Sequence, residues 1–275
     1  MNIVTRIIED LFFTIDFQDY WDFRHFGLKG ENIRFEGVDG TLLSGVFIHA
    51  YFHKDSPYTK PRGTIFFAPS GDHNLHFNLP QVTWLAANGF NVFGYDPRGS
   101  GKSPGHTTLG TCLEDVVSAF KYLKTRDDID QDNITLFGQR TGAYAILHLA
   151  AQHPVPGVTG MVIESCWATQ HGYFLRRYGP GLGHFCNAFM PQYENPIDNI
   201  RRIKIPIAIM VNGRDNSVPE KEVNDLTAAA PKGRIIWFDP KGKYLNSFAQ
   251  PLVWRDRFIE FTEANAPKEK KKKAK

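Results

Sequence analysis

The sequence lacks long hydrophobic runs, and it has few cysteines. No stretch approaches the roughly 20 apolar residues of a membrane span, and residues 1–20 mix charged and apolar side chains, unlike a secretory signal peptide. The three cysteines, Cys112, Cys166 and Cys186, are widely spaced and outside any CxxC pattern. These absences argue against a membrane-spanning protein, a disulfide framework and a zinc site, and they predict reduced thiols in a cytoplasmic chain.

The sequence also lacks a strong net charge once its C-terminal end is set apart. The whole chain has a formal net charge of +3, but residues 268–275 alone, with six lysines and one glutamate, carry +5. The body therefore carries −2, the difference between these two values. A nearly neutral body argues against a nucleic-acid-binding surface. We predict that residues 265–275 are a disordered basic tail; weak contact of this tail with anionic lipid or RNA is the alternative.

Strand-like and helix-like segments alternate from residue 32 onward. Two short strand-like runs at 32–36 and 42–49 flank the turn Val38-Asp39-Gly40, which is typical of a hairpin. The pattern predicts an α/β domain with a doubly wound, mostly parallel sheet of eight strands. Six further apolar runs show little alternation, as expected of strands buried on both faces: 64–68, 91–95, 134–137, 160–164, 207–211 and 234–238. Helical segments are predicted near 79–88, 112–125, 142–152, 219–230 and 250–264.

We predict a main domain over residues 29–264. Two segments depart from the alternation of strands and helices, one before this domain and one inside it. Residues 1–28 form an N-terminal amphipathic segment, which we expect to pack on the domain as a helix. Its alternative is a helix on a membrane surface, against which its acidic polar face argues. Residues 166–197 form a long connection rich in aromatic residues and glycine, without a clear period, and are predicted to be a short cap. The apolar face of the N-terminal segment consists of Val4, Ile7, Ile8, Leu11 and Phe12.

Four motifs follow predicted strands, and together they resemble the α/β-hydrolase family, particularly its bacterial serine-peptidase-like and esterase-like members. The resemblance covers roughly residues 30–262 and implies an α/β-hydrolase fold with an N-terminal hairpin and a cap insertion. The motifs are Phe67-Ala-Pro-Ser-Gly-Asp-His-Asn74, the DxRGxGxSxG run at 96–105, Gly138-Gln-Arg-Thr-Gly142 and Asn212-Gly-Arg-Asp-Asn-Ser-Val-Pro219.

The third motif departs from the family's nucleophile elbow, which has the form G-x-S-x-G. Gly138 and Gly142 are kept, but Arg140 stands in the position of the nucleophile. A guanidinium stays protonated and offers no lone pair for attack on a carbonyl. Thr141 does not replace the nucleophile, because the resemblance gives its position a backbone role as oxyanion donor. The sequence therefore predicts that serine-hydrolase chemistry is lost.

The acid position of the family triad is occupied, but its histidine position is not. Asp215 matches the aspartate, and the family's histidine follows the aspartate in the chain. All ten histidines lie at or before His184, and the resemblance puts Tyr244 in the histidine position. A tyrosine, with an ordinary pKa near ~10, is a poor general base at neutral pH. The oxyanion loop also departs from the family, with Pro69-Ser70-Gly71 in place of His-Gly-Asn.

These departures predict a pseudo-hydrolase that acts as a binding or scaffold protein for a small anionic ligand or a protein partner. The alternative is a hydrolase or other enzyme with non-triad chemistry, in which Arg140 is an electrophilic clamp and Asp215 or Asp72 is the base. We also expect the Arg140 guanidinium to lie within ~4 Å of the Asp215 carboxylate, since an unpaired buried charge costs several kcal/mol. The predicted ligand pocket consists of Gly71, Asp72, Arg140, Thr141, Asp215 and Trp167.

Other motifs do not predict a cofactor or a metal. The run Gly99–Ser103 looks like the end of a phosphate-binding loop, but Asp96 stands where its first glycine belongs. The acidic run at 128–133 lacks the glycine and glutamate of a calcium loop. Asp72, His73 and His76 could be read as metal ligands, but the sequence spacing does not identify a further ligand that would complete such a site.

Overall fold

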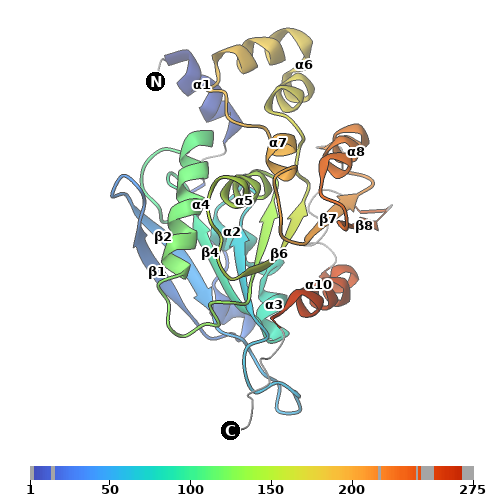
Figure 1. The fold of residues 1–275 in the computed structure, drawn as a ribbon. Helices are drawn as coiled ribbons and strands as arrows, with labels where there is room; N and C mark the ends of the chain where they lie inside the picture. Colours follow the sequence, from blue (N-terminus) through green and yellow to red (C-terminus); the bar gives the residue numbers. More distant parts are fainter. Residues whose placement is uncertain (1–2, 14–15, 216–217, 240, 243–250, 268–275) are drawn as a thin grey trace.

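A sheet of eight strands runs through the middle of the protein (Figure 1). The computed structural model describes residues 3–13, 16–215, 218–239, 241–242 and 251–267. The strand order is β1-β2-β4-β3-β5-β6-β7-β8; β2 is antiparallel to β1 and β4, and the remaining neighbours are parallel. The predicted fold class is confirmed. The strands are β1 (Gly30–Glu36), β2 (Leu42–Ile48), β3 (Thr64–Ala68), β4 (Asn91–Asp96), β5 (Ile134–Gln139), β6 (Val158–Glu164), β7 (Ile207–Asn212) and β8 (Ile235–Asp239).

The burial of the strands explains their sequence pattern. Every residue of β3, β4 and β5 is buried, so these central strands read as continuous apolar runs. The edge strand β1 buries Ile33 and Phe35 and exposes the residues between and beside them. Alternation is therefore seen in the edge strand β1, where one face of the sheet meets solvent.

Helices cover both faces of the sheet and form two hydrophobic cores with it. One core contains α4, α5, α7 and α8, and the other contains α2, η2, α3 and α10. The predicted helix at 79–88 is wrong in its extent: Pro80 has no backbone N–H to continue a helix, and two short segments, η2 and α3, cover this region instead. The helices are α2 (Leu75–Asn78), η2 (Leu79–Gln81), α3 (Thr83–Ala87), α4 (Leu109–Leu123), α5 (Thr141–Gln152), α7 (Pro196–Ile200), α8 (Glu220–Ala229) and α10 (Pro251–Asn265).

The predicted cap is helical. Helix α6 (Gln170–Phe189) bends at Gly179, which has φ 76° and ψ 172° and is followed by Pro180. The bend shifts the helical phase, so no single period runs through the segment. Helix α1 (Ile3–Phe12) lies beside the end of α6, and the Thr5 hydroxyl donates to the Phe189 carbonyl at 2.9 Å. A short helix, η1 (Phe23–Phe26), leads into β1.

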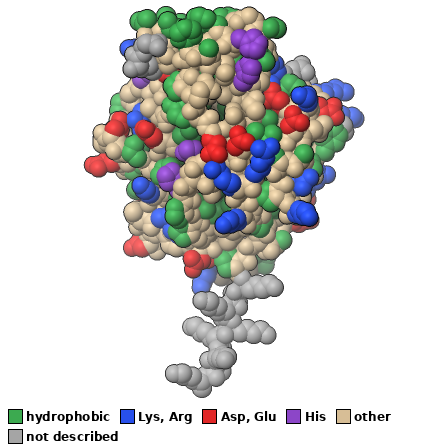
Figure 2. Space-filling model, turned by 45° about the horizontal axis from the view of Figure 1, so that its top comes forward, with side chains coloured by type: hydrophobic (Ala, Val, Ile, Leu, Met, Phe, Trp, Pro, Cys, Tyr) green, Lys and Arg blue, Asp and Glu red, His purple; other side chains and the backbone are tan. Residues whose placement is uncertain are grey.

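Helices α1 and α6 lie together at the top of the molecule, where apolar side chains gather on the surface (Figures 1 and 2). Across the described residues, none of the helices combines the length and apolar character needed to cross a membrane.

Candidate functional site

Arg140 occupies the sharp turn between β5 and α5. Its backbone has φ 49° and ψ −112°, a sparsely populated conformation for a residue with a side chain. The surrounding glycines enforce this turn: a Cβ on Gly142 would lie 2.1 Å from the Ala68 carbonyl oxygen, and one on Gly138 would lie 2.6 Å from the Gly142 carbonyl oxygen. The elbow therefore has the strained geometry of a nucleophile turn but presents a guanidinium.

The side chain of Arg140 forms an ion pair with Asp72 and not the predicted one with Asp215. Arg140 Nε lies 3.3 Å from Asp72 Oδ2. The sheet order explains the difference: Asp72 follows β3, which is the direct neighbour of β5, whereas Asp215 follows β7, two strands away on the other side. Arg140 thus pairs with the carboxylate that follows the neighbouring strand.

Asp72 stands among cations from three segments. Burial raises the pKa of the Asp72 carboxyl above its ordinary range, and the positive charges of Arg140, His73 and Arg177 oppose this rise. Burial likewise raises the pKa of Tyr173, which the same two arginines oppose. Since Arg177 and Tyr173 belong to α6, Arg140 lies where the loop after β3 meets the cap.

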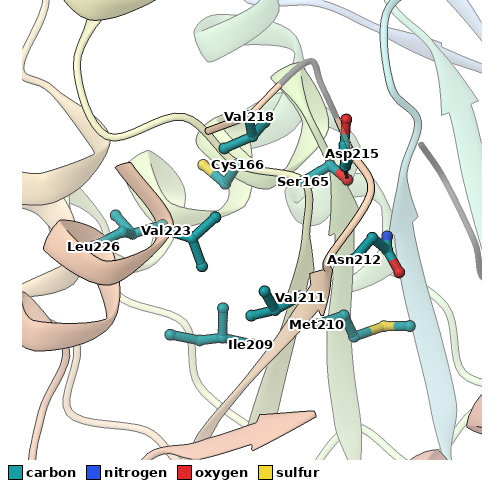
Figure 3. A pocket seen from close by; sticks show the side chains of 10 residues that line it. All are labelled: Ser165, Cys166, Ile209, Met210, Val211, Asn212, Asp215, Val218, Val223 and Leu226. Atoms are coloured by element: carbon teal, nitrogen blue, oxygen red, sulfur yellow. Dashed lines mark hydrogen bonds between the residues drawn. The ribbon is translucent and has the colours of Figure 1, made fainter. Parts of the chain in front are cut away.

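Asp215 lies at the carboxyl end of β7, in a buried position. The Ser165 hydroxyl donates to Asp215 Oδ2 at 2.6 Å, and the two side chains lie next to each other in Figure 3. The Arg214 backbone N–H donates to the Gly242 carbonyl at 2.8 Å. The loop toward Tyr244 thus begins beside Asp215, but Tyr244 itself lies outside the described residues.

The sequence analysis did not predict a buried network of three hydrogen-bonded polar side chains at the ends of the strands. The Gln139 amide donates to Glu164 Oε2 at 2.7 Å, and the Asn212 amide donates to Glu164 Oε1 at 3.0 Å. Glu164 also accepts, through its carbonyl, the Arg140 backbone N–H at 2.9 Å. The three side chains end β5, β6 and β7, so polar residues closing three neighbouring apolar strands were the available signal. They connect the elbow to the loop of Asp215.

The remaining predicted pocket residues separate into two groups. Gly71 has φ 78°, and a Cβ on it would lie 3.2 Å from the Thr141 side chain, so the oxyanion loop touches the start of α5. Trp167 is buried, and its ring packs 5.1 Å from that of Tyr173 and 6.1 Å from that of Tyr144. Gly71 and Thr141 thus lie with Asp72 and Arg140, whereas Trp167 packs beneath the cap. Their contact with a ligand stays a prediction.

The two histidines near Asp72 make contacts with the N-terminal segment. His73 Nδ1 lies 3.2 Å from Asp16 Oδ2, and His76 Nδ1 lies 2.7 Å from the Trp21 carbonyl oxygen. In the part of the chain that the structure describes, no group of three or more histidine, cysteine, aspartate or glutamate side chains is arranged to hold a metal ion.

Comparison with known proteins agrees with this fold. The family profile described as serine aminopeptidase, S33, matches residues 59–202. The uncharacterized protein YfhR of Escherichia coli K12 is 27% identical over 235 residues, which cover 85% of this chain and 80% of YfhR. The α/β hydrolase domain-containing protein aho-3 of Caenorhabditis elegans is 28% identical over 151 residues, 53% of this chain and 42% of aho-3. The esterase Pf2001 of Pyrococcus furiosus superposes with a TM-score of 0.73 at 19% identity, covering 93% of this chain and all of the esterase.

Proposed function

Because this chain belongs to the serine aminopeptidase S33 family of α/β-hydrolases, we propose that it has kept the family's fold and elbow but binds a small anionic ligand without serine-hydrolase catalysis. The observation that carries this proposal is Arg140 on the strained elbow. Its side chain is permanently charged and cannot be acylated, yet it occupies the position that the fold presents to a substrate.

The charges around the elbow favour an anion. Arg140, Arg177 and His73 surround the carboxylate of Asp72, whose raised pKa makes it easier to neutralise than an ordinary aspartate. Arginine binds carboxylate and phosphate groups through paired N–H donors. A ligand with such a group would compete with Asp72 for the guanidinium. A protein partner that inserts an acidic side chain would use the same contact.

The absence of serine-hydrolase activity is tested with a fluorophosphonate probe and a p-nitrophenyl butyrate assay. We expect no labelling and no hydrolysis above background, because Arg140 cannot attack either reagent. Labelling that disappears on changing one serine would overturn the proposal. Ester hydrolysis without labelling, lost in Asp72→Asn, would instead favour the alternative enzyme, with Asp72 as its base.

Ligand binding is tested by thermal unfolding in the presence of butyrate, octanoate and hexyl phosphate. We expect at least one of them to raise the melting temperature of the wild-type protein, since a ligand at 100 times its Kd adds about 2.7 kcal/mol of stability. The rise should be absent in Arg140→Met. Arg201→Met, which removes an exposed arginine paired with Asp198, is the matched control and should keep it. Equal shifts in both variants would contradict a site at Arg140.

The cytoplasmic location stays part of this proposal. Cys112, Cys166 and Cys186 are all buried and unpaired in the structure. Free thiols of this kind persist most readily in a reducing compartment.

A further inference from the structure

Five exposed apolar side chains on two neighbouring helices gather at the top of the molecule, and we call them the crest. Ile3 and Ile7 belong to α1, and Leu182, Phe185 and Phe189 belong to the second half of α6. Their exposed fractions range from 41% to 73%. The two helices are joined by the Thr5 to Phe189 hydrogen bond, and apolar side chains line the top of the space-filling view in this region (Figure 2). Large apolar residues gathered in this way indicate an interaction surface.

The two acidic residues of α1 both contact the main domain, but only Glu9 is buried. Glu9 is buried against the domain, where the Leu109 backbone N–H donates to it. Asp10 is exposed and shares the helical face of Ile3 and Ile7, and its carboxylate lies 3.4 Å from His106 Nε2. The acidic polar face had argued against a membrane surface, and the burial of Glu9 removes one of its two charges from the surface.

Two exposed arginines and one exposed aspartate, Asp10, are the charged side chains near the crest on α1 and α6. Helix α6 contains no aspartate or glutamate, and its charged residues are Arg176 and Arg177. Arg176 pairs with Glu222 of α8, whereas the side chain of Arg177 is exposed. Arg6, one turn from Ile3 on α1, is exposed as well. Exposed apolar side chains with arginines beside them suit an interface with an anionic bilayer.

The size of the crest favours a bilayer over a second copy of the chain. A stable protein dimer buries about 800 Å² on each partner, through some 20 to 30 residues. The crest offers five side chains on two short helices. A bilayer surface needs only a few apolar side chains to insert at the boundary between headgroups and acyl chains.

We infer that the crest docks the protein on the surface of an anionic lipid bilayer, with Ile3, Ile7, Leu182, Phe185 and Phe189 inserted among the lipids. Arg6 then faces the headgroups. The same helix α6 carries Tyr173 and Arg177 near Arg140, so docking places the elbow close to the lipid surface. The inference rests on the crest alone and is independent of what Arg140 binds.

The test is flotation of the full chain with vesicles of phosphatidylcholine mixed with phosphatidylglycerol, and with vesicles of phosphatidylcholine alone. We expect binding to the mixed vesicles and at least about tenfold weaker binding of the triple variant Leu182→Ser, Phe185→Ser, Phe189→Ser. The matched control, Val38→Ser with Leu42→Ser, removes equally exposed apolar groups from the hairpin and should bind like the wild type. Equal loss in both variants would overturn the inference.

Two further measurements separate the crest from the lysine-rich C-terminus and from self-association. A chain ending at Pro267 should still float with the vesicles. If this shortened chain fails to bind while the triple variant binds fully, the lysines make the contact and the inference is overturned. Sedimentation that shows a dimer abolished by the triple variant, without vesicle binding, would assign the crest to a second copy. Phe185→Trp guards against a folding defect: its fluorescence should shift to the blue with mixed vesicles, and an unchanged spectrum would contradict insertion.

Discussion

At the residue scale, Arg140 retains a backbone conformation whose usual purpose its side chain cannot serve. A backbone of this kind costs on the order of 1–3 kcal/mol and persists only where the surroundings enforce it. Here the close contacts of Gly142 with Ala68 and of Gly138 with the first turn of α5 enforce it. The strain is thus fixed by packing between β3, β5 and α5, and it does not depend on catalysis.

Restoring a hydroxyl at the elbow should not restore an esterase. In Arg140→Ser the new hydroxyl would have no histidine after Asp215 to take its proton, so we expect p-nitrophenyl butyrate hydrolysis to stay near background. Arg140→Ser with Tyr244→His should be faster by about 10²–10⁴-fold, the usual contribution of a general base. The measurement is kcat/KM for both variants.

The control for this pair is Arg140→Ala with Tyr244→His, which has the base but no nucleophile and should be inactive. Turnover by the single Arg140→Ser variant equal to that of the double variant would mean that another group acts as the base.

At the element scale, helix α1 contains a titratable group in its buried face. Burial raises the pKa of Glu9 to about 7, the nearby charge of Asp10 adds to this rise, and the hydrogen bond from Leu109 offsets part of it. The folded protein therefore holds a proton on Glu9 under conditions in which the unfolded chain, with an ordinary glutamate pKa of 4.5, has released it. Such a group favours the folded state at low pH and loses that contribution as pH rises.

The free energy of unfolding should thus fall by about 2–3 kcal/mol through Glu9 as pH rises from 5 to 8, across the folded-state pKa of about 7. Glu9→Gln cannot titrate and should lose this dependence, so that it exceeds the wild type in stability at pH 8. Urea unfolding at pH 5 and pH 8 measures both. Glu220→Gln, on exposed α8, should follow the wild type; a Glu9→Gln variant with the wild-type pH dependence would show that Glu9 is ionised in the fold.

At the scale of the whole molecule, Arg98 connects three distant parts of the chain. From the loop after β4, it reaches Asp115 of α4 at 2.6 Å and Asp39 of the β1–β2 hairpin at 2.7 Å. Asp115 is fully buried, and it also accepts the Arg98 backbone N–H at 2.8 Å. The DxRGxGxSxG run, whose end resembles a phosphate-binding loop, is therefore held by internal contacts of its own.

Arg98→Met should destabilise the fold by about 3–5 kcal/mol, because it leaves the Asp115 carboxylate buried without its cation. Arg98→Met with Asp115→Leu should recover part of this loss, since both charges are then removed. The free energies of unfolding of the two variants are measured by urea unfolding. Arg201→Met, which breaks an exposed pair with Asp198, should change stability by less than about 1 kcal/mol. A double variant less stable than the single one would mean that Asp115 acts through its backbone contact.

The sequence by itself determined the sheet, because strands buried on both faces are mostly apolar, and β3, β4 and β5 are apolar apart from polar residues near their ends. It also determined the elbow, since only glycine permits the contacts made by Gly138 and Gly142. The sequence also shows directly that Arg140 occupies the nucleophile position of this elbow.

The tertiary structure alone decided what Arg140 contacts and which way α1 turns. The pairing with Asp72 follows from β3 and β5 being neighbours, and strand order is not written in any local pattern. Helical periodicity groups Ile7 with Ile8, but packing against the domain buries Ile8 with Glu9 and leaves Ile7 exposed. Periodicity fixes which residues share a face; the rotation of a short helix against its neighbours depends on the shape of the surface that receives it.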